Sequence, residues 1–241
     1  MATGVTVLLE GSVDDEQANK SEWVRVKFRR KSSEPAGAPV DEDVDPAASA
    51  DPGQVTTAGP RDIDDVSEDD GVERIDLGSL LLTNVEGLEI RLQVDEETEA
   101  VQSVVLAGAD GAVELRAFAA PRGGDLWSEI RPRIAAEYAQ RGGTATEREG
   151  RYGTELLCQL TVRTEDGRTA NQPSRVVGIN GGRWMLRATL LGRAAVEPDE
   201  LGPWDDAIAA TVVRRGTVAM PSGGDLPLTL PPRDQLSRRE S

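Results

Sequence analysis

The sequence contains no histidine, one cysteine and few aromatic residues: four tryptophans, two tyrosines and two phenylalanines among 241 residues. Without histidine, a histidine-based catalytic triad and a histidine metal site are excluded. The single cysteine excludes a disulfide framework and Cys₄ or Cys₂His₂ zinc sites. The apolar run at residues 4–9 is too short for a transmembrane span. A lone cysteine is typical of a reducing compartment, so we expect a cytoplasmic protein.

Positive charge is also scarce, with 27 Lys and Arg against 43 Asp and Glu and a net charge of −16. This balance argues against an overall basic nucleic-acid binder. Most of the excess lies in residues 34–76, which carry 14 acidic residues and two arginines. Because residues 34–75 have no aromatic residue and no apolar run, we expect a disordered acidic linker there. Such a linker either solubilises the protein or is an acidic arm that docks on a basic partner or mimics nucleic acid.

Residues 1–33 have the composition of a tail. They include the basic cluster Val26-Lys27-Phe28-Arg29-Arg30-Lys31. Because a GTG codon encodes valine and can start translation, we expect Val26 to be the native start and residues 1–25 to be a start-site artefact. The cluster is expected to be solvated, with contact to nucleic acid or anionic lipid as the alternative. Residues 232–241 are expected to form a second, fraying tail.

Residues 76–231 show the hydrophobic patterns of one folded domain. Leu88, Ile90, Leu92 and Val94 alternate with polar residues, which predicts a half-buried strand. Two apolar runs around a turn at residues 108–111 predict a hairpin. Strands are expected at residues 87–96, 101–120 (the hairpin), 143–149, 152–163, 175–180, 183–191 and 217–220, with turns at 165–167 and 180–182.

Two helices are predicted between these strands. Asp125 is a suitable N-cap for the first helix, in which apolar residues recur at helical spacing until Gly142 and Gly143. Pro132 is expected to kink that helix or to shorten its first turn. The second helix is expected to begin at Pro203 and to end before Gly216. The element order predicts an α+β fold with a largely antiparallel sheet and two helices packed on one of its faces, by analogy a Mog1/PsbP-like sandwich.

Three segments resemble an actinobacterial domain family of unknown function. They read AFAAPRGGDLWSEIR at residues 117–131, GINGGRWMLRATLLG at 178–192 and RRGTVAMPSGGDLPLTLP at 214–231. The resemblance covers about residues 70–231 and departs from the family's pattern at Pro132. It implies a cytoplasmic actinobacterial protein with a short basic stretch followed by an acidic linker, and it implies no activity, cofactor or catalytic residue.

Two further features have an ordinary structural interpretation. Cys158 alternates in phase with apolar neighbours, so we expect a buried thiol rather than a nucleophile. The pattern P-x-G-G-D-L occurs at residues 121–126 and again at 221–226. A glycine-rich turn before a helix can bind phosphate, but the aspartate of this pattern would repel an anion. We therefore expect turns, with the aspartate capping.

The acidic residues near the second helix supply the candidates for an enzyme. Oxygen ligands there suit Mg²⁺, although carboxylates are also favoured at helix N-termini. The alternative function is therefore a carboxylate- or Mg²⁺-dependent enzyme acting on a phosphorylated or nucleotide substrate. Its candidate residues are Glu147, Glu149, Asp199, Glu200, Asp205 and Asp206.

Three arginines form the preferred candidate site. Strand alternation places Arg183 and Arg187 on one face, and Arg163 in the neighbouring run is expected to share it. Guanidinium groups suit planar recognition of carboxylate or phosphate, whereas ordinary ion pairs with Glu155 and similar residues are the alternative. We therefore expect a non-enzymatic binding or adaptor domain that contacts an acidic protein partner and has no cofactor and no metal. Binding of nucleic acid through residues 27–31 is the weaker alternative.

Overall fold

The computed structural model describes residues 21–27, 59–67, 69–95, 97–98, 100–163, 169–200, 202–232 and 235–238. Residues 28–31 of the basic cluster, residues 34–58 of the acidic linker and the turn expected at 165–167 lie outside these ranges. The start-site expectation for Val26 stays a prediction.

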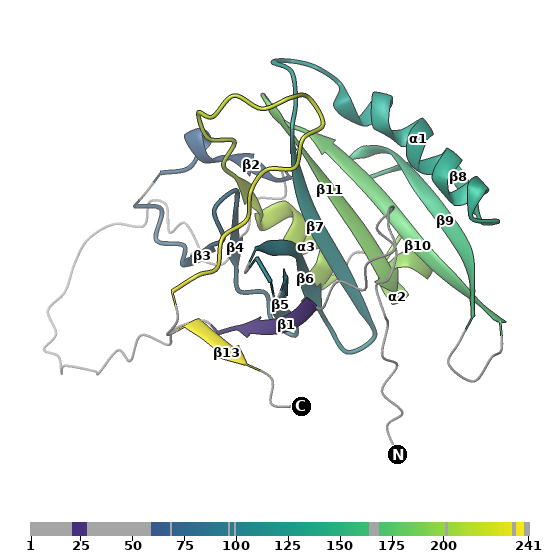
Figure 1. Ribbon diagram of the computed structural model, residues 1–241, viewed down its shortest axis with the longest axis horizontal. Helices are drawn as coiled ribbons and strands as arrows, with labels where there is room; N and C mark the ends of the chain where they lie inside the picture. Colours follow the sequence, from purple (N-terminus) through teal and green to yellow (C-terminus); the bar gives the residue numbers. More distant parts are fainter. Residues whose placement is uncertain are drawn as a thin grey trace, which may run out of the picture.

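Within the described residues, nine strands form one sheet in which every neighbouring pair is antiparallel (Figure 1). The alternation that predicted these strands reflects burial: in β5 (Glu89–Asp95), the side chains of Ile90, Leu92 and Val94 are buried. Across the sheet the strands are β13 (Leu236–Arg238), β1 (Ser21–Val26), β5 (Glu89–Asp95), β6 (Val101–Ala107), β7 (Gly111–Ala119), β11 (Trp184–Gly192), β10 (Thr169–Asn180), β9 (Gly153–Arg163) and β8 (Thr144–Gly150).

A smaller sheet and the helices cover the large sheet. The small sheet has the order β2 (Arg61–Asp62), β12 (Val212–Val213), β4 (Leu80–Thr83) and β3 (Arg74–Asp76). The helices are α1 (Leu126–Gln140), α2 (Arg193–Val196) and α3 (Pro203–Ala210), with a 3₁₀ turn, η1, at Ile63–Asp65. No helix in the described ranges is both long and apolar enough to span a bilayer. The α+β class with a largely antiparallel sheet is confirmed.

The two main helices lie on opposite faces of the large sheet, which corrects the prediction of a common face. Trp204 and Ile208 of α3 belong to the core shared with the small sheet, together with Trp184 of β11. Trp127 of α1 belongs to a second core with Met185, the next residue of β11. Because β7 and β11 carry apolar side chains on both faces, each face needs its own cover. Figure 1 shows α1 along β8 and β9, away from α3.

Helix α1 begins where it was predicted to begin, directly after Asp125, and it continues beyond Pro132. The Asp125 side chain accepts a hydrogen bond from the Ser128 backbone N–H (3.0 Å), which caps the helix. The helix then continues past the exposed Pro132 to Gln140. The first turn is therefore not shortened, because the proline lies beyond it, where it removes one backbone hydrogen bond.

The second predicted helix is shorter than expected. Helix α3 ends at Ala210, and Val212–Val213 form β12, which pairs with β2 and β4. The apolar residues that extended the helical pattern are thus buried as a strand. Residues 217–220, predicted as a strand, have no regular structure.

Ordered structure also extends beyond the predicted boundaries of the domain. Strand β2 and η1 precede Asp76, and β3 ends at it, so part of the expected linker has regular structure. Strand β1 pairs with β5 and β13 at the edge of the large sheet, where Val26 lies opposite both Ile90 and Leu236. These short strands escape prediction because their apolar residues are few and their partners are distant in sequence.

Candidate functional site

The three arginines predicted to share a face do not all do so. Arg187 of β11 lies opposite Gly178 of β10 and opposite Arg116 of β7. Arg163 of β9 lies opposite Thr169. The register aligns odd-numbered positions of β9 with even-numbered positions of β11, so Arg163 and Arg187 occupy positions on opposite faces. The prediction that Arg163 shares a face with Arg187 is therefore wrong. The register between β9, β10 and β11, which decides this, cannot be read from the sequence.

Arg183 lies just before β11, at the rim of the sheet. Its side chain is exposed, and its carbonyl accepts a hydrogen bond from the Ala120 backbone N–H (3.0 Å). The neighbouring Gly182 carbonyl accepts from Gly123 N (3.1 Å), which brings the exposed Arg122 to the same rim.

The side chain of Arg187 lies beside that of a second arginine, Arg116, and not beside a carboxylate. The guanidinium carbons of Arg187 and Arg116 lie 5.3 Å and 5.6 Å from the centre of the Phe118 ring, a distance typical of cation–π contacts. Arg116 also forms a salt bridge with Asp225 (2.7 Å). No carboxylate in the described residues lies within salt-bridge distance of Arg187, and its Nε is buried without a hydrogen-bond partner. Desolvation, followed by the charge of Arg116, lowers the pKa of Arg187.

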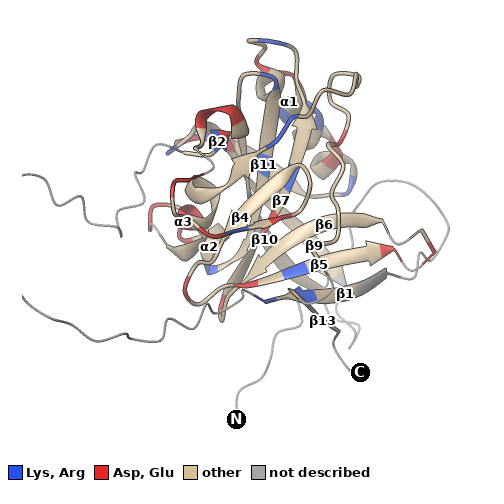
Figure 2. Cartoon of the chain, turned by 90° about the vertical axis from the view of Figure 1, so that its left-hand side faces the viewer, with Lys and Arg blue, Asp and Glu red and all other residues tan. Residues whose placement is uncertain are grey.

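We call Arg116, Arg122, Arg183 and Arg187 the arginine surface. Figure 2 shows basic segments on β7 and β11 beside α1, whereas acidic segments gather around α3 and near β2. The basic and acidic side chains of the domain are therefore partly segregated.

Both copies of the P-x-G-G-D-L pattern form the same turn, and both turns reach the end of β7. Gly124 N and Gly224 N each donate to the carbonyl of the preceding proline (3.1 Å), and Gly123 and Gly223 have positive φ (64° and 81°), as in type II turns. The second turn is bound to Ala119 by two backbone hydrogen bonds of 2.8 Å. The predicted turns are confirmed.

The two aspartates of these turns have different partners. Asp125 accepts hydrogen bonds from Ser128 and from the Asn180 amide (2.7 Å), and the Ser128 hydroxyl is the largest cause of its lowered pKa. Asp225 instead contacts Arg116. The repeated sequence therefore supplies a helix cap at one position and a counter-charge for the arginine surface at the other.

Of the carboxylates proposed for an enzyme, Asp199 and Asp205 join one network of ion pairs through Arg148, Glu155 and Arg175, and the other four lie in separate places. In the described chain no three His, Cys, Asp or Glu side chains are grouped so that they could hold a metal ion. Glu147 pairs with Arg131, Glu149 accepts from Thr154, Asp199 pairs with Arg148, Glu200 pairs with Arg193, Asp205 lies 4.0 Å from Arg175, and Asp206 is exposed.

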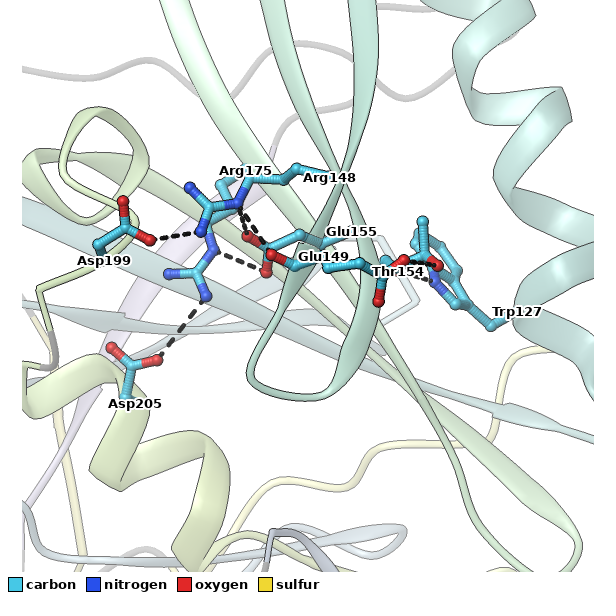
Figure 3. Close-up of polar contacts among 8 residues, drawn as sticks. All are labelled: Trp127, Arg148, Glu149, Thr154, Glu155, Arg175, Asp199 and Asp205. Atoms are coloured by element: carbon cyan, nitrogen blue, oxygen red, sulfur yellow. Dashed lines mark hydrogen bonds and ion pairs between the residues drawn. The ribbon is translucent and has the colours of Figure 1, made fainter.

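One buried ion cluster joins the large sheet to α3 (Figure 3). Glu155 of β9 is fully buried and accepts a hydrogen bond from Arg175 Nε of β10 (3.0 Å). Its second oxygen lies 3.2 Å from Arg148 Nε of β8. Arg175 is also buried and points toward the buried Asp205 of α3. These contacts tie three strands and a helix together.

The turn between β8 and β9 creates the space for this cluster. A β-carbon on Gly150 would lie 2.3 Å from Glu155 Oε2, so only glycine leaves room for the carboxylate. Burial raises the pKa of Glu155, while Arg175 opposes that effect. Glu155, Arg175 and Asp205 are buried, whereas Arg148 and Asp199 carry the cluster to the surface. Its alternating charges are suited to cross-linking the fold.

Cys158 lies in the core beneath α1, as the alternation predicted. It is 1% exposed, and burial raises the pKa of its thiol to about 12. At neutral pH the sulfur is therefore a protonated thiol and a poor nucleophile.

The sequence reasoning missed Arg116 and Arg175, and it named Glu155 only as a partner in an ordinary ion pair. Glu155 and Arg175 stand directly before the apolar runs at residues 156–158 and 176–177, and a charged residue at such a position is the signal that could have identified them. Arg116 required the pairing of β7 with β11, which are separated by α1 and three strands.

The sequence profile of one protein family matches residues 59–236. This range includes the arginine surface, both turns and the ion cluster. No curated protein and no solved structure matches the chain.

Proposed function

Because the chain belongs to the family described as Protein of unknown function (DUF3710), we propose a function from its surface chemistry: a non-enzymatic binding domain whose arginine surface contacts an acidic protein partner. The observation that carries this proposal is the half-buried side chain of Arg187, which lies opposite a second arginine, has a buried Nε without a hydrogen-bond partner and has no carboxylate partner in the described residues. We place the domain in the cytoplasm, where its single thiol would stay reduced.

The arrangement of Arg187 costs folding free energy. Like charges directly opposite each other in a strand pair destabilise a sheet, and a buried charge without a counter-ion is unfavourable. The Phe118 ring offsets part of this cost. A carboxylate supplied by another molecule would offset the remainder, because guanidinium groups form strong planar hydrogen bonds with carboxylates.

The charges near this site favour a protein over nucleic acid. Glu114, Asp225 and Glu137 contribute to the electrostatic field at Arg187, and the whole chain is acidic. These negative charges would repel a continuous phosphate backbone. A partner with a few carboxylates on a surface avoids most of that repulsion.

The proposal is tested with a short rhodamine-labelled peptide that carries two glutamates in an otherwise uncharged sequence as the acidic probe. Binding to the full chain is followed by fluorescence anisotropy at low ionic strength, where charge interactions are least screened. We expect Arg187→Gln to weaken binding about tenfold, which corresponds to about 1.4 kcal/mol. Arg61→Gln is the matched control, since Arg61 is an exposed arginine on β2 of the small sheet and its loss changes the net charge equally.

Two results would overturn the proposal. One is equal weakening by Arg187→Gln and Arg61→Gln, which would show that only net charge matters. The other is unchanged binding in Arg187→Gln while thermal unfolding shows that the variant is folded.

A further inference from the structure

A second pair of arginines, toward the β13 edge of the large sheet, repeats the arrangement of Arg116 and Arg187. Arg25 of β1 lies directly opposite Arg91 of β5. The carboxylate of Glu89 contacts both of them, at 2.7 Å from Arg25 Nε and 2.9 Å from Arg91 Nη2. We call Arg116 and Arg187 the inner pair and Arg25 and Arg91 the outer pair. Because each pair contacts one carboxylate, each group of three side chains keeps one net positive charge.

The strand register places both pairs on the same face of the large sheet. Arg91 lies opposite Val105 of β6, and Val105 lies opposite Glu114 of β7. Residues directly opposite each other point to the same face, and so do residues two positions apart in one strand. Arg91, Glu114 and Arg116 therefore share a face. Leu92, the next residue of β5, points the other way, into the core that contains α3.

Both pairs reach solvent on this face. The side chains of Arg25 and Arg91 are 40% and 37% exposed, and that of Arg116 is 26% exposed. Figure 2 shows basic segments on β1 and β5 at a distance from α1. One partner can therefore contact both pairs without displacing a helix.

The distance between the pairs follows from the geometry of the sheet. In the strand order β1-β5-β6-β7-β11, the centres of the pairs lie three strand spacings apart, which is about 14 Å. Along the strands, Arg116 lies two residues from Glu114, which is level with Arg91, and this adds an offset of about 7 Å. Together these displacements separate the pairs by about 16 Å. An extended chain covers that distance in about five residues.

The residues between the pairs are uncharged or acidic. Ser103 and Val105 of β6 are buried, and Glu114 lies beside the inner pair. A carboxylate placed above Glu114 would be repelled, whereas a carboxylate placed above either pair would be attracted. This face therefore favours separated carboxylates over a continuous acidic run.

We infer that the acidic partner binds both pairs at once, through an extended segment whose two carboxylates lie about 16 Å apart. This inference rests on the proposed function, because it extends the same arginine surface across the sheet. Once one carboxylate contacts the inner pair, the second contact is intramolecular. The affinity then rises although neither contact is stronger by itself.

The test compares two peptides of the same composition, in which two glutamates are either adjacent or six positions apart in an otherwise uncharged sequence. Six positions span about 16 Å without full extension. Binding to the isotope-labelled full chain at low ionic strength is followed by NMR titration, which reports the arginine Nε–H signals of each pair. We expect the peptide with separated glutamates to bind about tenfold more tightly, because only this peptide can reach both pairs.

Arg91→Gln supplies the decisive variant. It leaves the outer pair without net positive charge, so the separated peptide should lose most of its advantage. The adjacent peptide still has the inner pair and should weaken by less than about twofold. Arg61→Gln on the small sheet is the control with the same change in net charge, and it should leave the ratio of the two affinities unchanged.

The outcomes separate this inference from the proposed function. Failure of both peptides to perturb the signals of the inner pair would overturn the proposed function and the inference with it. If both peptides bind at the inner pair with equal affinity, or if Arg91→Gln and Arg61→Gln weaken the separated peptide equally, only the contact with two pairs is overturned.

Discussion

The indole ring of Trp127 lies against the backbone of Gly178. A β-carbon on Gly178 would stand 2.1 Å from Trp127 Cδ2, so the ring occupies the space that any other residue would fill. The indole N–H donates to the Thr154 carbonyl (2.6 Å), and the Trp127 backbone N–H donates to Asn180 Oδ1 (3.1 Å). This contact fixes α1 on β9 and β10, and with it the face that carries Arg187.

Gly178→Ala should destabilise the domain. The added methyl group has no space, and the indole cannot retreat without losing its hydrogen bond. We expect a loss of about 1–3 kcal/mol in the free energy of unfolding, measured by urea denaturation. Gly182→Ala is the control, because its β-carbon would meet nothing within 4 Å. Equal stability of the two variants would contradict the packing described.

The buried pair of Glu155 and Arg175 should show strong coupling. Glu155→Leu leaves the buried Arg175 without its main counter-charge, so we expect a loss of about 3–5 kcal/mol. The double variant Glu155→Leu/Arg175→Met should be less destabilised than Glu155→Leu alone. The exposed pair of Arg131 and Glu147 provides the comparison, and Glu147→Leu should cost less than about 1 kcal/mol. A double-mutant cycle with no coupling would refute the cluster's role.

Cys158 should be protected from alkylation in the folded protein. Its pKa of about 12 leaves almost no thiolate at pH 8, whereas the unfolded thiol has an ordinary pKa near 8.5. Iodoacetamide at pH 8 should therefore react only in urea, as counted by mass spectrometry. Because the folded pKa is the higher one, stability should fall as pH rises from about 8.5 toward 12, and Cys158→Ala should remove that component. Rapid labelling of the native chain would contradict the burial.

Asp70 should contribute to stability only above its folded pKa. Two hydrogen bonds with Arg74 (3.0 Å and 2.6 Å) lower the pKa of Asp70 to about 2. The unfolded value is near 3.9, so the stabilisation is present above about pH 4 and is lost as pH falls toward 2. Asp70→Asn should cost less than about 1 kcal/mol at pH 7, because the pair borders solvent. The difference from the natural chain should disappear near pH 2, and a difference that persists there would show a cause other than charge.

The elements with strong local signals could be predicted from the sequence. The alternation in β5, the capped start of α1 at Asp125 and the two glycine-rich turns depend on neighbouring residues alone. The short strands β1, β2 and β13 could not be predicted in this way, because each forms only against a partner far along the chain. Helix α3 was overextended for a related reason: Val212 fits a helical apolar face, but the pairing of β12 with β2 and β4 decides its conformation.

The sequence by itself determined the acidic balance, the absence of histidine chemistry, the antiparallel α+β class and the inward direction of Cys158, because composition and local periodicity carry these properties. Only the tertiary structure decided which charges meet. The pairing of β7 with β11 placed Arg116 beside Arg187, the return of the chain at residues 221–226 brought Asp225 to Arg116, and the packing of α3 brought Asp205 to Arg175. Such contacts join residues that are distant along the chain, so no local pattern encodes them.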